Sequence, residues 1–176
     1  MSYRAMSLIG IAMTSRRVAV LALVIVMFGC YRDARWPDLS ERERRLVFGL
    51  MECDECASGQ ADSVVALGQR VVPTLTTLLL QGPAAEDVIR YRQHLQDLHR
   101  RLELYAATHP GTRPPRSDLV YVGRYLNNYI ATYQVRAAGA LARIGGARAR
   151  QTLDSAATRP WRSDVADAIQ AALDSL

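Results

Sequence analysis

The chain has 176 residues, of which 49% are hydrophobic and 22% are charged, a composition typical of a globular domain rather than a disordered segment. All 22 basic residues are arginine, and the absence of lysine excludes Schiff-base chemistry and a lysine-bearing phosphate loop. The first 29 residues hold three arginines and no acid, so the remaining net charge is 19 minus 17, or +2. This balance gives no reason to expect nucleic acid as a partner.

The amino-terminal segment has the plan of an export signal. Arg16 and Arg17 precede an unbroken apolar run over 18–28, which ends at Gly29 and Cys30. A charged region, eleven apolar residues and a small residue predict a signal peptide over 1–29. Eleven helical residues span only about half of a hydrocarbon core, so a stable transmembrane helix is the weaker interpretation.

The end of that segment, Met27-Phe28-Gly29-Cys30, resembles the lipobox of bacterial lipoproteins. The resemblance implies that Cys30 is lipidated and becomes the first residue of a membrane-anchored chain in the cell envelope, facing the periplasm or the exterior. Gly29 and Cys30 fit the pattern, whereas Met27 and Phe28 depart from it. An uncleaved anchor and an ordinary signal peptide therefore stay open as alternatives.

After Cys30, residues 30–39 form a short predicted tether, and a helical domain is expected over 40–176. Ser40 and Glu43 have the spacing of a capping box and predict a helix start. The apolar face that follows extends this helix to about Cys56. Period-two alternation is scarce throughout the chain, so the predicted fold class is all-α.

Two strings share the pattern of a helix end, a glycine turn and a second helix: ALGQRVVPTL over 66–75 and IGGARARQTL over 144–153. Both resemble the turn of HEAT-like repeats of the phycobilisome-lyase (PBS-lyase) type. The resemblance implies a short α-solenoid, whose units bury their apolar faces by stacking on one another. A final helix after Pro160 and Trp161 has an acidic outer face suited to a terminal cap.

Between these strings, two apolar patterns have the alternating spacing of three and four residues that is typical of heptads. The first comprises Val88, Tyr91, Leu95, Leu98, Leu102 and Tyr105, and the second comprises Leu119, Val122, Leu126, Tyr129 and Tyr133. A proline-rich linker over 108–116 separates them, which predicts a long antiparallel helical hairpin over about 84–133 inserted into the solenoid. Its second helix is expected to continue past Tyr133 to Ile144, and the leucines of the pattern are expected to hold the hairpin shut.

Cys53 and Cys56 form a CxxC motif. Haem attachment would require a histidine directly after it, and a zinc site would require two more nearby ligands. Redox catalysis needs a stabilised thiolate, whereas Glu52, Asp54 and Glu55 place negative charge around these thiols. We expect a structural disulfide in an exported protein, with an inert reduced pair, or a catalytic or metal-binding pair, as the alternatives.

The three histidines, His94, His99 and His109, do not have the spacing of a chelating pair on one helix face. HEAT-like metal enzymes carry His-Glu pairs, which this chain lacks, so we expect solvated histidines, no metal and no cofactor. Tyr121, Tyr125 and Tyr129 recur every four residues on one predicted helix face. Aromatic residues with a polar tip are frequent in interfaces, so this tyrosine stripe is the candidate surface for an unknown protein partner, and packing within the hairpin is the alternative.

No nucleophile with a base and an orienting group is visible, so no catalytic residue is expected. The two resemblances together imply a membrane-tethered helical-repeat module for protein interaction or scaffolding in the bacterial envelope. One alternative is a lyase-type or thiol-dependent enzyme, because some HEAT-like proteins resemble bilin lyases. The other alternative is a purely structural envelope lipoprotein.

Overall fold

The computed structural model describes residues 36, 39–53 and 58–176. Within these ranges the secondary structure is helical without strands, so the predicted all-α fold class is confirmed there. The shorter helices are α2 (Glu41–Glu52), α3 (Ser58–Val65), α4 (Val72–Gln81), α7 (Gly146–Ala157) and α8 (Ser163–Asp174), with one 3₁₀ turn, Gly68–Arg70. The two long helices are α5 (Ala85–Thr108) and α6 (Asp118–Ile144).

Helix α2 begins at the predicted capping box. The side chain of Ser40 accepts a hydrogen bond from the backbone N–H of Glu43, and the carboxylate of Glu43 accepts one from the N–H of Ser40 at 2.8 Å. Hydrogen bonding of the Glu43 carboxylate to Ser40, first to its side chain and then to its backbone N–H, lowers the pKa of Glu43. The helix ends at Glu52, four residues before the end expected from its apolar face.

The main core lies among α2, α3, α4, the carboxyl-terminal half of α6, α7 and α8. Side chains from these six helices form one buried cluster, whose largest fully buried members are Met51, Leu75, Leu78, Leu79, Leu141, Leu153 and Ile169. Leu39, at the end of the predicted tether, is also buried in this cluster, and Trp36 packs against it. Small residues at Ala137, Ala138 and Ala140 are buried where α6 is surrounded by its neighbours.

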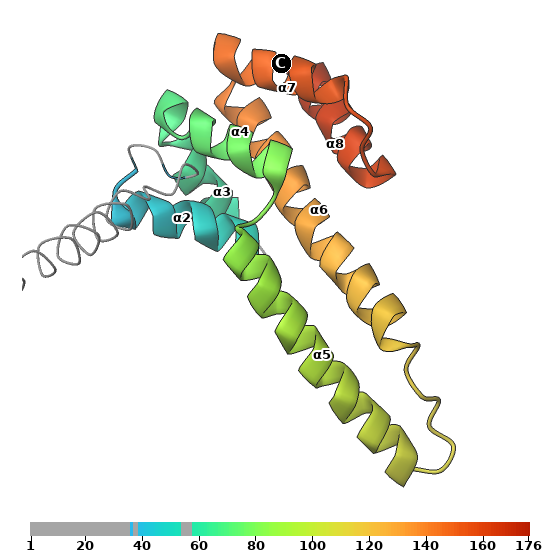
Figure 1. The fold of residues 1–176 in the computed structure, drawn as a ribbon. Helices are drawn as coiled ribbons and strands as arrows, with labels where there is room; N and C mark the ends of the chain where they lie inside the picture. Colours follow the sequence, from blue (N-terminus) through green and yellow to red (C-terminus); the bar gives the residue numbers. More distant parts are fainter. Residues whose placement is uncertain (1–35, 37–38, 54–57) are drawn as a thin grey trace, which may run out of the picture. The chain divides into compact units, whose positions relative to one another are not determined.

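Helices α5 and α6 lie side by side and run in opposite directions, joined by the segment 109–117 (Figure 1). A second, smaller cluster of Leu95, Val122 and Leu126 holds them together, with partly buried neighbours that include Tyr91 and Tyr129. Helix α6 continues without a break from this pair into the main core, as its sequence predicted. The two long helices are therefore part of the same packed unit, Arg35–Leu176.

The expectation that Leu98 and Leu102 close this pair is wrong. Their side chains are 36% and 38% exposed, whereas Leu95 is buried. The side chain of His99 is buried instead, so the buried face of α5 passes through 91, 95 and 99. Successive residues of an α-helix lie about 100° apart around its axis, so this change is larger than the drift of about 20° per heptad of a straight helix. It goes with the contact between the His99 ring and the carbonyl oxygen of Arg116 in the linker.

Candidate functional site

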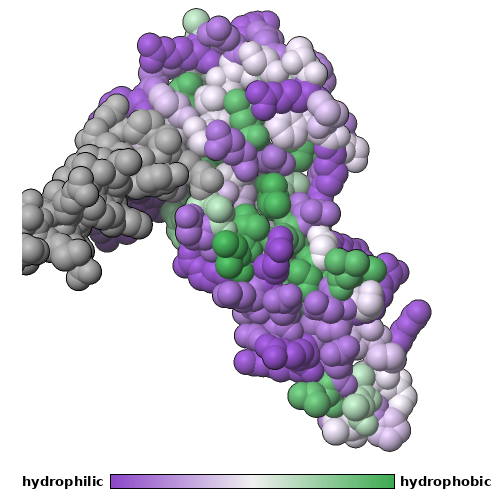
Figure 2. Space-filling model, viewed as in Figure 1, coloured by the Kyte–Doolittle hydropathy of each residue, from purple (hydrophilic) through white to green (hydrophobic). Residues whose placement is uncertain are grey.

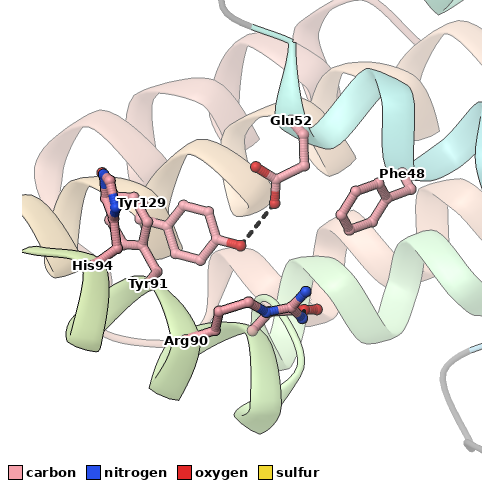
Figure 3. A pocket seen from close by; sticks show the side chains of 7 residues that line it. Phe48, Glu52, Arg90, Tyr91, His94 and Tyr129 are labelled. Carbon is pink, nitrogen blue, oxygen red and sulfur yellow. Dashed lines mark hydrogen bonds and ion pairs between the residues drawn. The ribbon is translucent and has the colours of Figure 1, made fainter.

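A cleft of about 410 Å³ opens between α2, α5 and α6. Figure 3 shows how its side chains face one another across this space. We call it the aromatic cleft; it is lined by Phe48, Glu52, Asp87, Arg90, Tyr91, His94 and Tyr129. Helices α2 and α5 each contribute one face, because Phe48 and Glu52 are four residues apart on α2 while Asp87, Arg90, Tyr91 and His94 recur at helical spacing on α5. Helix α6 contributes Tyr129.

Glu52 is the polar centre of the cleft. Its Oε1 accepts a hydrogen bond from the hydroxyl of Tyr129 at 2.7 Å and another from the hydroxyl of Tyr133. Its other carboxylate oxygen, Oε2, has no hydrogen-bond partner among the residues that the structure describes. The carboxylate is thus oriented by two tyrosines from α6 while retaining an acceptor.

The two phenols lie in a negative and partly desolvated environment. Burial is the main reason that the pKa of Tyr133 is raised above its usual value, and the hydrogen bond to Glu52 raises it further. Burial also raises the pKa of Tyr129, and the charges of Glu52 and Asp87 add to this increase. Both hydroxyls therefore remain protonated donors at neutral pH, which keeps the bonds to Glu52 intact.

Aromatic rings form the wall of the cleft on the α5 and α6 side. The rings of Tyr91 and Tyr129 stack with their centroids 4.3 Å apart, and His94 stacks on Tyr91 at 6.5 Å. Across from them on α2, Phe48 is 42% exposed, which leaves a large apolar side chain available at the surface. Arg90 and Asp87 form an ion pair at the edge of the cleft.

A second cleft, of about 220 Å³, shares Glu52, Tyr91 and Tyr129 with the first. Its other lining residues are Met51, Cys53, Tyr125, Asn128, Thr132 and Arg136. The guanidinium of Arg136 donates hydrogen bonds to the carbonyl oxygens of Leu50 (3.3 Å), Met51 (2.6 Å) and Cys53 (2.5 Å). These are carbonyls at the end of α2, so Arg136 caps that helix and fixes the position of Glu52.

The tyrosine stripe is divided between packing and exposure. Tyr129 belongs to both clefts, Tyr125 lines the second cleft and is 42% exposed, and Tyr121 lines neither. Tyr121 instead packs at 5.2 Å from the ring of His99 and at 4.8 Å from that of Tyr125. Of the three, Tyr125 is the one whose side chain is both exposed and beside a cleft.

Cys53 is disulfide-bonded, and it lines the second cleft. Cys56, the predicted partner, and Cys30, the predicted lipidation site, lie outside the described residues. The pairing and the lipidation therefore stay predictions.

The expectation of a solvated histidine is wrong for His99. Its side chain is buried, and its Nε2 lies 2.6 Å from the carbonyl oxygen of Arg116, so this nitrogen carries the proton that it donates. Its Nδ1 lies 3.5 Å from a carboxylate oxygen of Glu103 and 4.0 Å from one of Asp118. The burial arises because the linker returns over α5 and brings Arg116 to the ring, a contact that helix spacing alone does not reveal.

The described residues contain neither a candidate metal site nor a candidate transmembrane helix. No group of three or more His, Cys, Asp or Glu side chains in the described ranges is placed to hold a metal ion. Over the same part of the chain, no helix has both the length and the hydropathy needed to cross a bilayer.

Sequence reasoning found Tyr129 but missed most of the aromatic cleft. Tyr91 was visible as a heptad residue, whereas Phe48 and Glu52 carried no signal because their neighbours in the cleft come from distant helices. Comparison of the chain with protein-family models, with curated proteins and with solved structures found no match.

Proposed function

We propose that this protein is a membrane-tethered helical-repeat module that binds a protein partner at the surface of a bacterial cell membrane. The proposal joins a short HEAT-like solenoid, an inserted α5–α6 hairpin, a lipid anchor at Cys30 and a binding surface at the two clefts. The observation that carries it is the group of exposed aromatic side chains, Phe48 and Tyr125, beside the clefts that share Glu52.

Contacts between the two turn segments and the helices that follow them support the repeat part of the proposal. The side-chain amide of Gln69 donates to the carbonyl oxygen of Gly145 at 2.9 Å, and the hydroxyls of Thr76 and Thr152 lie 3.0 Å apart. Both contacts join residues that are 76 positions apart. A constant offset is what stacked copies of one supersecondary unit produce, with α4 lying against α7.

The conformation of the second turn also supports stacking. Gly146 has φ +84°, and a Cβ at this position would lie 2.8 Å from Nε2 of Gln69. Glycine therefore permits both the left-handed backbone and the close approach of the first turn. This gives a physical reason for the Gly-Gly break between α6 and α7.

The inserted long helices supply the part of the surface that differs from a plain solenoid. Figure 2 shows hydrophobic residues interspersed with hydrophilic ones on the visible face of the α5–α6 pair. The exposed apolar residues of the pair include Ile89, Leu104, Leu119 and Tyr125. Of these, only Tyr125 lines one of the two clefts, which is why we place the partner there and not along the whole pair.

The test is in-cell crosslinking of the full-length chain, followed by capture from detergent-solubilised membranes. We expect a specific crosslinked partner with the wild type, and at least about a tenfold loss with Phe48→Ala combined with Tyr125→Ala, since anchor residues of interfaces each contribute about 1–2 kcal/mol or more. Leu104→Ala is the matched control, because Leu104 is 69% exposed and lines neither cleft. Equal capture by all variants, or a loss confined to Leu104→Ala, would place the partner elsewhere.

A further inference from the structure

We propose that the aromatic cleft binds a basic side chain, an arginine or a lysine presented by the partner, with its charged end on Glu52 and its carbon chain against the aromatic rings. This inference rests on the proposed partner-binding function and names the chemistry that the cleft recognises. It follows from charge balance, from the free oxygen of Glu52 and from the aromatic lining, which are independent observations.

The charges of the cleft favour a cation. The lining includes two carboxylates, Glu52 and Asp87, and one guanidinium, Arg90. Arg90 is paired with Asp87, so the charge of Glu52 is left without a cationic partner within the lining. Arg136, the cation beside the second cleft, is bonded to the carbonyls at the end of α2.

Glu52 is already oriented to receive a donor. Two tyrosine hydroxyls bind the same oxygen, Oε1, and Oε2 has no partner among the described residues. An ammonium or guanidinium N–H donating to Oε2 would form a charge-assisted hydrogen bond, which is about twice as strong as a neutral one. Because the carboxylate is held in place before binding, little side-chain freedom is lost when the cation arrives.

The aromatic lining suits the rest of an arginine or lysine side chain. Cations are attracted to the faces of aromatic rings, and the stems of both side chains are apolar. The stacked rings of Tyr91 and Tyr129 stand on one side of the cleft and the exposed ring of Phe48 on the other (Figure 3). The volume of about 410 Å³ lies within the range of about 300–1,000 Å³ typical of ligand sites.

The negative environment of Tyr129 agrees with this assignment. Burial is the first cause of its raised pKa, but the charges of Glu52 and Asp87 also act on it in the same direction. Asp87 therefore contributes to the negative potential at the phenol even though it is paired with Arg90. An acidic ligand would meet this potential, whereas a basic ligand would be stabilised by it.

The test is an NMR titration of the ¹⁵N-labelled full-length chain in detergent micelles with three small amides. The probes are Nα-acetyl-arginine amide, Nα-acetyl-norleucine amide, which is apolar, and Nα-acetyl-glutamate amide, which is acidic. We expect the arginine probe to shift the backbone resonances of residues around Phe48, Glu52 and Tyr91, and to bind more weakly as salt is added. Binding of the norleucine probe with equal affinity would show an apolar groove, and preference for the glutamate probe would show an anion site; either result overturns the inference.

Two variants separate the charge of the cleft from its fold. Glu52→Gln retains an acceptor oxygen for the tyrosines and removes the charge, so we expect at least about tenfold weaker binding of the arginine probe, the loss typical of a hydrogen bond to a charged group. Asp154→Asn makes the same change in net charge at an exposed site on α7 and is expected to bind like the wild type. If Glu52→Gln does not fold, Phe48→Ala replaces it, and unchanged binding in that variant contradicts the proposed lining.

The outcome is distinguishable from that of the partner-capture experiment. A captured partner that does not depend on Glu52, together with no binding of the arginine probe, would preserve the proposed function and reject the basic ligand. Binding of the arginine probe without any captured partner would preserve the basic ligand and reject the proposed function.

Discussion

At the scale of single residues, Glu52 connects the stability of the fold with the chemistry of the site. Its carboxylate accepts hydrogen bonds from the hydroxyls of Tyr129 and Tyr133, which lie on α6 and are 77 and 81 positions later in the chain. Loss of either phenolic proton would place two negative charges next to each other in a partly buried position. This pair of bonds therefore makes the folded state sensitive to alkaline pH.

We expect the free energy of unfolding to fall as pH rises above about 10. The pKa of both phenols is raised above the ordinary value of 10.0, so the folded state keeps protons that the unfolded state loses. The contribution of the two phenols to the free energy of unfolding is fully present below pH 10. It decreases above pH 10, because the folded state then binds more protons than the unfolded state. Urea unfolding followed by circular dichroism between pH 7 and 11.5 measures this slope.

The variant that carries both Tyr129→Phe and Tyr133→Phe should show a shallower alkaline decline and lower stability at pH 7, because it loses two hydrogen bonds to a charged group. Tyr105→Phe is the control, since Tyr105 is 54% exposed and is expected to keep the wild-type profile. An identical slope in the double variant would mean that the two phenols do not cause the pH dependence.

At the scale of elements, the long helices show what a heptad pattern determines and what it does not. The pattern predicted the existence and direction of α5 and α6, and the continuation of α6 to Ile144. It did not predict which residues of α5 are buried, because the linker contacts His99 through the carbonyl of Arg116, 17 positions later, and a heptad pattern does not contain that contact. His99 takes the place beside Leu95 that the pattern assigned to Leu98.

Substitution along α5 tests this packing. We expect Leu95→Ala to cost about 2–5 kcal/mol of unfolding free energy, the usual loss for a buried leucine. Leu98→Ala and Leu102→Ala should each cost less than about 1 kcal/mol, because their side chains are already partly solvated. Urea denaturation gives the three values, and equal large losses would indicate that the pair is closed along the heptad pattern in solution.

The candidate site could be predicted from the sequence less well than the helices could. A capping box at Ser40 can be read from four consecutive residues, and it is present as predicted. The bonds of Glu52 and Arg136 span between 77 and 86 positions, so no local pattern contains them. Tyr91, Tyr125, Tyr129 and Cys53 belonged to patterns visible in advance, but those patterns did not show which residues meet in the clefts.

At the scale of the whole molecule, the central expectation is attachment to a membrane. We expect the wild type to sediment with membranes and to carry a lipid on Cys30, which fractionation and intact-mass analysis measure. Cys30→Ser should release the protein or leave an unprocessed precursor. Cys56→Ser, the control for loss of a cysteine other than Cys30, should stay with the membrane, and an unmodified Cys30 within a longer chain would contradict the anchor.

The cap that Arg136 places on α2 also has a consequence for the order in which the chain folds. During synthesis α2 emerges before α6, so the carbonyls at its end lack this cap until Arg136 follows more than eighty residues later. Contacts over such separations require a large loop to close before they contribute, which slows folding. The cleft that α2 helps to form can therefore be completed only after α6 has been made, although α2 is among the first helices to leave the ribosome.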